Sequence, residues 1–353
     1  MTNSMAVGGG LLSACGLGLL ALDAQSGGGH WDHVLWQLIG CVAGASCFAV
    51  FVRRAWRTDR DSVRASALFA GAVLVLPVGE VPGFGIDRSF LAEIIRFVAV
   101  IVVGTVVPWR ASIRGNLPTK LDRWAVWLPT LVLTWCALCL GNLPVVFAII
   151  VVTSIMLRVA GHRSGAWLQA VVAATVLLAF LVLPHPDRRA RVAFSVGQLV
   201  TARPETAKRS AAGMMMRSRN TGAARRPALF DLPPRVVRHL VIASIVGYTG
   251  YPGATAVTVL FGVVGWAGFR RARDAATLEE RVMVAGMTAT LVVPAALHIV
   301  ACLVFLAGHA GSLPFVSYGP GDLVLAWVAL GFVAAGQRGA QGLYISPAYS
   351  PYN

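Results

Sequence analysis

Two ionisable residues of opposite charge stand three positions apart inside an apolar stretch of the chain. They are Glu93 and Arg96, at the start of the apolar segment near residues 90–107. On a helix this spacing places both side chains on one face, where they can pair or serve a polar cavity. Glu93 is thereby a candidate base, because ionisable groups at membrane depth are costly and tend to be functional. The alternative is a structural ion pair, or side chains that extend to the membrane surface.

A second set of polar groups lies in a turn between two long apolar segments near the C-terminus. The turn reads Leu313-Pro314-Phe315-Val316-Ser317-Tyr318-Gly319-Pro320-Gly321-Asp322. Such a dense run of proline, hydroxyl and glycine residues beside bilayer-depth sequence favours a functional re-entry. An ordinary hairpin connector is the alternative. Asp322 adds a carboxylate that is either a catalytic base or the N-cap of the last helix.

One long segment, from Pro184 to His239, is strongly basic. It holds 12 lysine and arginine residues against three acids, Asp187, Glu205 and Asp231. Guanidinium groups can bind phosphate oxygens in pairs of hydrogen bonds, so the segment fits a pyrophosphate or anionic lipid ligand. The alternative for residues 203–226 is a disordered, solvated loop, because large apolar side chains are scarce there. Topology and this loop account for the positive charge of the chain, so we predict no nucleic-acid partner.

No sequence pattern calls for a metal or a cofactor. All six cysteines fall within apolar segments, where they act as small apolar side chains. Cys136 and Cys139 have only two residues between them, but no polar residue nearby completes a metal site. Phosphate-binding glycine loops and nucleotide-binding patterns are absent from the sequence. We therefore predict no cofactor.

The elements that position these residues are predicted to be transmembrane helices. Hydrophobic residues make up 57% of the chain and charged residues 13%, and the mean hydropathy is +0.71. Apolar runs of the length that a bilayer core of about 30 Å requires occur about ten times. They lie near residues 5–24, 34–52, 65–80, 90–107, 124–140, 143–160, 166–184, 240–269, 282–308 and 321–336. The predicted fold is thus an all-α polytopic membrane protein with one long basic loop between helices seven and eight.

The distribution of basic residues predicts the orientation of these helices. Arginines and lysines concentrate in the loops after the second, fourth, sixth and eighth segments, whereas the short loops between them hold almost none. Short cytoplasmic loops carry such an excess, so both termini are predicted to be cytoplasmic and residues 184–239 to lie outside. The first ten residues lack a positive region, so the first segment is predicted to be a retained helix rather than a cleaved signal peptide.

Several of these motifs resemble one known family. The turn Leu313–Asp322 resembles the L-P-F-x-S-Y-G-G-S-S signature of the SEDS family (FtsW, RodA and SpoVE), and Ala92–Arg96 resembles its S-E-x-x-K element. Residues 188–192 resemble its basic R-Q-R-[IV] element, and Gln198 stands in its G-Y-Q element. The resemblance covers nearly the whole chain and implies one SEDS-like membrane domain over residues 1–353, with a short cytoplasmic tail at 339–353. It implies substrate-binding roles for Glu93, Arg96, Arg189, Arg191, Gln198, Ser317, Tyr318 and Gly319.

The same resemblance implies a function in cell-wall assembly. SEDS proteins polymerise peptidoglycan glycan strands from lipid II beside a class B penicillin-binding transpeptidase, in the bacterial plasma membrane, during division, elongation or sporulation. We therefore expect this chain to act on or bind lipid II. His239, however, stands where the family carries an aspartate held essential for glycosyl transfer, and the acids that follow it are replaced by Gly247 and Tyr248.

Three functions remain open at this point. The chain is an active polymerase with Asp322 or Glu93 as a relocated base, a catalytically silent member that still binds lipid II, or a transporter of lipid-linked precursors. A transporter needs a polar path through the bundle, for which Glu93, Arg96, His298 and Asp322 are the candidates.

Overall fold

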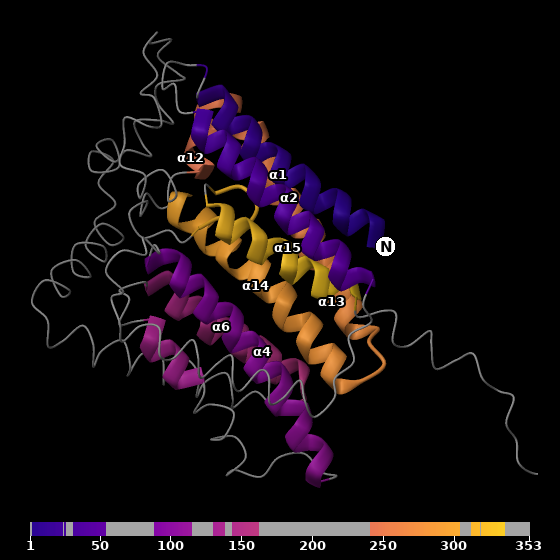
Figure 1. Ribbon diagram of the computed structural model, residues 1–353. Helices are drawn as coiled ribbons and strands as arrows, with labels where there is room; N and C mark the ends of the chain where they lie inside the picture. The colour runs from indigo at the N-terminus through magenta and orange to yellow at the C-terminus, as the bar shows by residue number, and fades with distance from the viewer. Residues whose placement is uncertain are drawn as a thin grey trace, which may run out of the picture.

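The computed structural model describes residues 2–23, 25, 31–53, 88–114, 130–137, 143–161, 241–303, 312–317 and 319–335. Within these ranges every regular element is a helix (Figure 1). The predicted all-α fold is therefore confirmed for this part of the chain. The segments predicted near 65–80 and 166–184 lie outside the described residues, as does the basic loop 184–239.

The helices follow the apolar runs of the sequence closely. Five of those in the described ranges are long and apolar enough to cross a membrane, and helices satisfy every backbone polar group internally, as hydrocarbon surroundings demand. The labelled helices are α1 (Thr2–Asp23), α2 (Trp31–Arg53), α4 (Arg88–Arg114), α6 (Leu143–Val159), α12 (Val241–Thr249), α13 (Tyr251–Arg273), α14 (Leu278–Leu303) and α15 (Pro320–Ala335).

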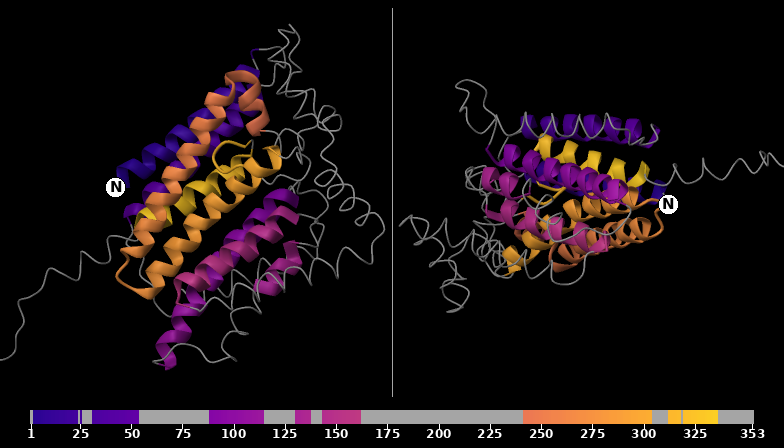
Figure 2. Two further views of the ribbon diagram at one scale, coloured as in Figure 1. Left: turned by 180° about the vertical axis from the view of Figure 1, so that it is seen from behind. Right: turned by 90° about the horizontal axis from the view of Figure 1, so that it is seen from below.

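α14 lies at the centre of the described bundle. It contacts α4 and α6 on one side and α13 and α15 on the other, and α15 packs extensively on α2. Figure 2 shows the axes of these helices running side by side. In α4 and α14, 72% of the membrane-length window is buried, against 22% to 33% in α1, α2 and α13. The inner pair can therefore carry polar side chains, whereas α1, α2 and α13 turn much of their surface outward.

Glycines in α1 and α2 allow the turn before α15 to approach closely. A Cβ atom on Gly40 would lie 2.8 Å from the Cα atom of Pro320, and one on Gly16 would lie 2.9 Å from the carbonyl oxygen of Val316. Such contacts are too short for any larger residue unless the backbone moves. α1 and α2 therefore pack directly against the backbone at Val316 and Pro320.

The eighth predicted segment, 240–269, is divided in the structure. α12 ends at Thr249 and α13 begins at Tyr251, with Gly250 between them at φ 82°. Glycine adopts this left-handed conformation without strain. Pro252 lies at the first turn of α13, where its missing N–H is tolerated. The prediction of one continuous helix over 240–269 was therefore wrong, because Gly250 and Pro252 together favour a break.

The N-terminal end of α1 lies at the arginine-rich end of α13. The guanidinium Nη1 of Arg271 donates a hydrogen bond to the sulfur of Met5, at 3.5 Å. Arg270, Arg271 and Arg273 all fall in the last turn of α13. The first residues of the chain and this basic end therefore lie on the same side of the bundle.

Candidate functional site

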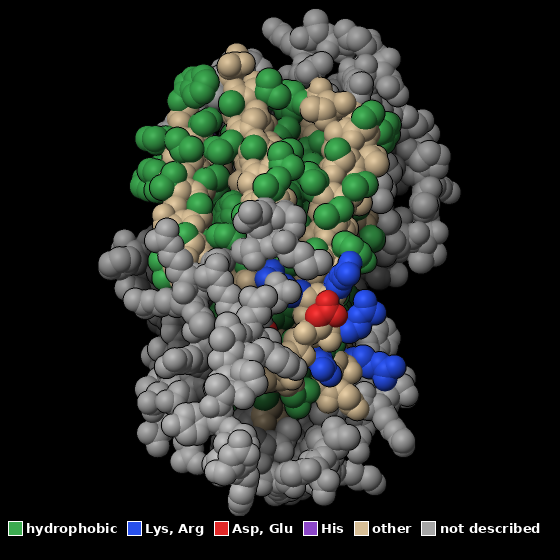
Figure 3. Space-filling model, turned by 90° about the vertical axis from the view of Figure 1, so that its right-hand side faces the viewer, with side chains coloured by type: hydrophobic (Ala, Val, Ile, Leu, Met, Phe, Trp, Pro, Cys, Tyr) green, Lys and Arg blue, Asp and Glu red, His purple; other side chains and the backbone are tan. Residues whose placement is uncertain are grey.

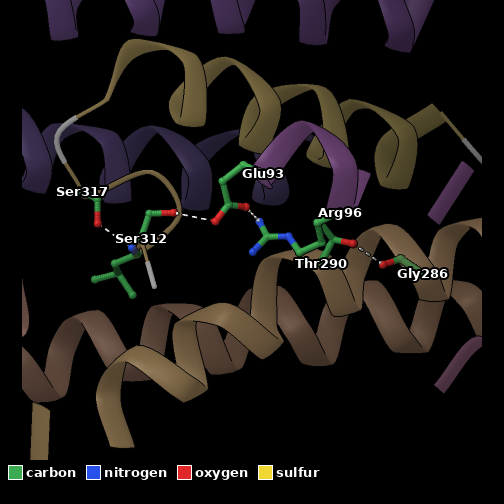
Figure 4. A network of polar contacts seen from close by, with 7 residues as sticks. Glu93, Arg96, Gly286, Thr290, Ser312 and Ser317 are labelled. Carbon is green, nitrogen blue, oxygen red and sulfur yellow. Dashed lines mark hydrogen bonds and ion pairs between the residues drawn. The ribbon is translucent and has the colours of Figure 1, made fainter. Parts of the chain in front are cut away.

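The predicted acid–base pair forms a buried ion pair on α4. Nη2 of Arg96 lies 2.5 Å from Oε2 of Glu93, and the two residues are only 8% and 4% exposed. Their spacing of three residues brings them together on one helix face. The carboxylate is also held from a distant segment, because Oγ of Ser312 donates to Oε1 of Glu93 at 3.1 Å (Figure 4). The structure thus joins α4 to the residue immediately before the signature turn.

That turn is compact and closed by its own serine. The backbone N–H of Leu313 donates to Oγ of Ser317 at 2.5 Å, and the N–H of Ser317 donates back to the carbonyl of Leu313 at 2.9 Å. Phe315 has a φ of 65°, a strained value for a side chain of this size. Its ring is buried edge-on against Trp327, with centroids 5.7 Å apart. Tertiary packing therefore fixes a conformation that the local sequence would avoid.

α2 holds the turn through one glutamine. Nε2 of Gln37 donates to the carbonyl of Ser317, and Oε1 of the same side chain accepts from the N–H of Gly319, both at 3.2 Å. Gln37 is fully buried. The amide thus satisfies a donor and an acceptor of the backbone around residue 318. Gln37 was not among the predicted substrate-binding residues, although an uncharged polar residue inside an apolar helix was the available signal.

The Glu93–Arg96 pair lines a small cavity between α4, α14 and α15. The cavity measures about 20 Å³ and is also lined by Thr290, Ser312 and Asp322. A volume of this size holds about one water molecule. Thr290 and Leu291 of its lining lie midway along α14, so the cavity lies at membrane depth. α4 and α15, which are far apart in sequence, thus place two carboxyl groups and one guanidinium around a single space.

Three charged groups line the cavity: Glu93, Arg96 and Asp322. Glu93 is neutralised by Arg96, whose buried Nε has no hydrogen-bond acceptor among the described residues. Asp322 is 8% exposed. It was predicted as a possible N-cap, but α15 begins at Pro320, so Asp322 lies within the first helical turn. A carboxylate there still interacts favourably with the helix dipole.

Three of the remaining predicted site residues are described by the structure and five are not. Ser317 and Gly319 belong to the turn, where they take part in the contacts with Gln37 and Leu313. His298 on α14 is fully buried. Five residues lie outside the described residues: Arg189, Arg191, Gln198, His239 and Tyr318. In the described part of the chain, no group of three or more His, Cys, Asp or Glu side chains is placed to hold a metal ion.

Comparison with known proteins places this arrangement in a family. The family model of the FtsW/RodA/SpoVE cell cycle proteins matches residues 91–341. That range includes the ion pair and the signature turn, whereas no curated protein sequence gives a match.

Solved structures share the fold. A chain from the structure titled "Structural coordination of polymerization and crosslinking by a peptidoglycan synthase complex" is similar at a TM-score of 0.67 and 17% identity, covering 97% of this chain and 98% of that one. The rod shape determining protein RodA of Thermus thermophilus is similar at a TM-score of 0.63 and 15% identity, covering 94% of each chain. This chain is a polytopic all-α membrane protein and belongs to the FtsW/RodA/SpoVE family of cell cycle proteins.

Proposed function

We propose that this protein serves peptidoglycan assembly by binding lipid II, a polyprenyl pyrophosphate that carries sugars, without polymerising it. The observation that carries the proposal is the network of Glu93, Arg96 and Ser312. It combines a buried guanidinium, a carboxylate that neutralises it, and a hydroxyl from the residue immediately before the signature turn. A buried arginine held in this way is suited to a pyrophosphate, which offers the same paired oxygens as a carboxylate.

On binding, the pyrophosphate of lipid II would replace Glu93 as the partner of Arg96. Its Nη2 faces Glu93 and its Nε has no acceptor among the described residues, so a pyrophosphate can take both donors. The cavity of about 20 Å³ is far too small for a sugar. The ligand therefore enters only when the turn at 312–317 moves away from α4.

The same residues argue against catalysis. A base that takes a proton from a sugar hydroxyl must lie within hydrogen-bond reach of it and be ionised at the working pH. In the closed arrangement Glu93 is paired with Arg96, and the cavity that Asp322 lines has room for about one water molecule, so neither carboxylate reaches a sugar hydroxyl before the turn moves. The stretch from Leu232 to Gly253 contains no acid at all. The position at which the family resemblance implies an aspartate is His239.

The proposal extends to a partner and a location. The first similar structure comes from a complex that coordinates polymerisation with crosslinking. We propose that this chain also assembles with a class B penicillin-binding transpeptidase, in the bacterial plasma membrane with both termini in the cytoplasm. A silent member would then act by presenting lipid II or by holding the crosslinking enzyme in place.

Reconstitution with labelled lipid II tests this proposal. The purified chain should bind lipid II and form no glycan polymer, alone or with the transpeptidase, under conditions in which an active family member forms polymer. Arg96→Met should weaken binding at least about tenfold, the loss expected for charge-assisted hydrogen bonds. Arg158→Ala should not, since that arginine is exposed in the last turn of α6.

Two other results would refute this proposal, and each would establish a different function. Polymer made by the wild type and abolished in Asp322→Asn would identify a relocated base and an active enzyme. Movement of labelled lipid II across a vesicle membrane, dependent on Glu93 and Arg96, would instead establish the transporter.

A further inference from the structure

The outward face of α13 is apolar and ends in an aromatic residue followed by arginine. Tyr251, Val259, Val263 and Trp266 are 65%, 57%, 53% and 61% exposed. Their spacing keeps them on one side of the helix, and Arg270 continues the same line one turn beyond Trp266. Figure 3 shows basic side chains gathered below an apolar surface on this side of the molecule.

The length of this face matches a bilayer. Fifteen residues separate Tyr251 from Trp266, which corresponds to about 22 Å along a helix, and Arg270 lies about 28 Å from Tyr251. A hydrocarbon core is about 30 Å thick, and tyrosine and tryptophan gather at its two boundaries. The register therefore places Trp266 and Arg270 at the level of the lipid headgroups.

Arg270 is held in place by the indole ring. The central carbon of its guanidinium lies 5.4 Å from the centre of the Trp266 ring, within the range of a cation–π interaction. In a stacked geometry the N–H groups point outward in the plane of the guanidinium and can still donate. The pair therefore presents a preorganised cation beside exposed apolar surface.

Acidic residues nearby balance the positive charge of this end of α13 only in part. Glu280 interacts with Arg271, which is buried and points towards Met5. Arg281 donates to the carbonyl of Ala275 at 3.5 Å. Asp274 is exposed and caps the C-terminal end of α13, next to the exposed Arg273. At this end of α13 and the start of α14, four arginines (Arg270, Arg271, Arg273 and Arg281) thus stand against three acids (Asp274, Glu279 and Glu280).

We propose that Trp266, Arg270 and Arg273 form a binding site for the phosphate headgroup of an anionic phospholipid in the leaflet at this end of α13. The ligand is a lipid rather than a soluble phosphate or an acidic protein, because the cations lie directly below an apolar face of bilayer length. Its acyl chains cover Val259 and Val263 while its phosphate accepts from the two arginines. The site is independent of the proposed lipid II site, which lies midway along α14.

Native mass spectrometry of the full chain in detergent tests the site, with dioleoyl phosphatidylglycerol and dioleoyl phosphatidylcholine titrated in parallel. The wild type should bind phosphatidylglycerol at least about fivefold more tightly, the effect of one arginine near an anionic headgroup. Arg270→Ala with Arg273→Ala should remove that preference. Trp266→Ala should weaken it about threefold through loss of the cation–π contact, and Trp266→Phe should restore part of it.

Arg158→Ala is the matched control, since this exposed arginine ends α6 with buried Ser154 one turn before it. It should leave the preference unchanged. Equal binding of the two lipids, an unchanged preference in the double variant, or an equal loss in the control would overturn the proposal. Displacement of the lipid by millimolar glycerol phosphate would also overturn it, because the site would then be one for soluble phosphate. All these positions are exposed, and the wild-type comparison needs no variant to fold.

Discussion

Gln37→Leu should destabilise the whole described bundle, although Gln37 lies far in sequence from every charged residue of the site. Leucine has a similar volume and suits an apolar helix, so the change removes hydrogen bonds rather than packing. The variant leaves two backbone groups without their partner, the carbonyl of Ser317 and the N–H of Gly319. Water cannot easily replace Gln37, because its side chain is fully buried.

The expected cost follows from these two groups. A buried polar group left without its partner costs about 1 to 3 kcal/mol, so two groups give about 2 to 4 kcal/mol when the turn relaxes in part. Leucine in place of glutamine recovers some of this loss through its added apolar surface, by less than about 1 kcal/mol. The net destabilisation should be about 2 kcal/mol or more.

The assay is the free energy of unfolding of the purified protein in mixed micelles, titrated with a denaturing detergent. Ser46→Ala is the matched control on the same helix, because Oγ of Ser46 is exposed and donates only to the carbonyl of Val42. It should change the free energy of unfolding by less than about 0.5 kcal/mol. If Gln37→Leu and Ser46→Ala are equally stable, the contacts between α2 and the turn do not hold the fold together.

Two further predictions use the same unfolding assay. Gly40→Ala should cost about 1 to 3 kcal/mol, because the new methyl group meets the backbone of Pro320 at 2.8 Å; Gly10→Ala, with nothing within 4 Å, should cost nothing, and equal stability of the two variants would contradict the close approach. Glu93→Gln should cost about 3 to 5 kcal/mol by leaving Arg96 buried without its counter-ion, and Glu93→Gln with Arg96→Met should recover most of that loss. A double variant as unstable as the single one would show that the pair is not coupled.

The helices and the Glu93–Arg96 ion pair could be predicted from sequence. Runs of apolar residues long enough for a bilayer have few structural solutions, so the positions of α1, α2, α4, α14 and α15 follow directly from them. The pairing of Glu93 with Arg96 is also local, since three residues on a helix fix it. The break at Gly250 was missed although Gly250, Pro252 and Gly253 interrupt the apolar run there and signal it.

The long-range contacts could not be predicted in this way. Ser312 and Glu93 are 219 residues apart, and Gln37 and Ser317 are 280 apart, so no periodicity relates them. The resemblance drew attention to Ser317 and Gly319 as substrate-binding residues. In the structure, Ser317 closes the turn and Gly319 contacts Gln37, and Ser312 is the residue that reaches the ion pair.

The central claim is that the Glu93–Arg96–Ser312 network binds the pyrophosphate of lipid II. A lipid II analogue with a diazirine beside the pyrophosphate tests it most directly, by irradiation of the bound complex and mapping of the labelled peptides by mass spectrometry. The predicted labels lie on α4 around Glu93 and Arg96 and on residues 312–317. Labels on the connection between α13 and α14 instead, or none above those of a diazirine lipid without pyrophosphate, would contradict the claim.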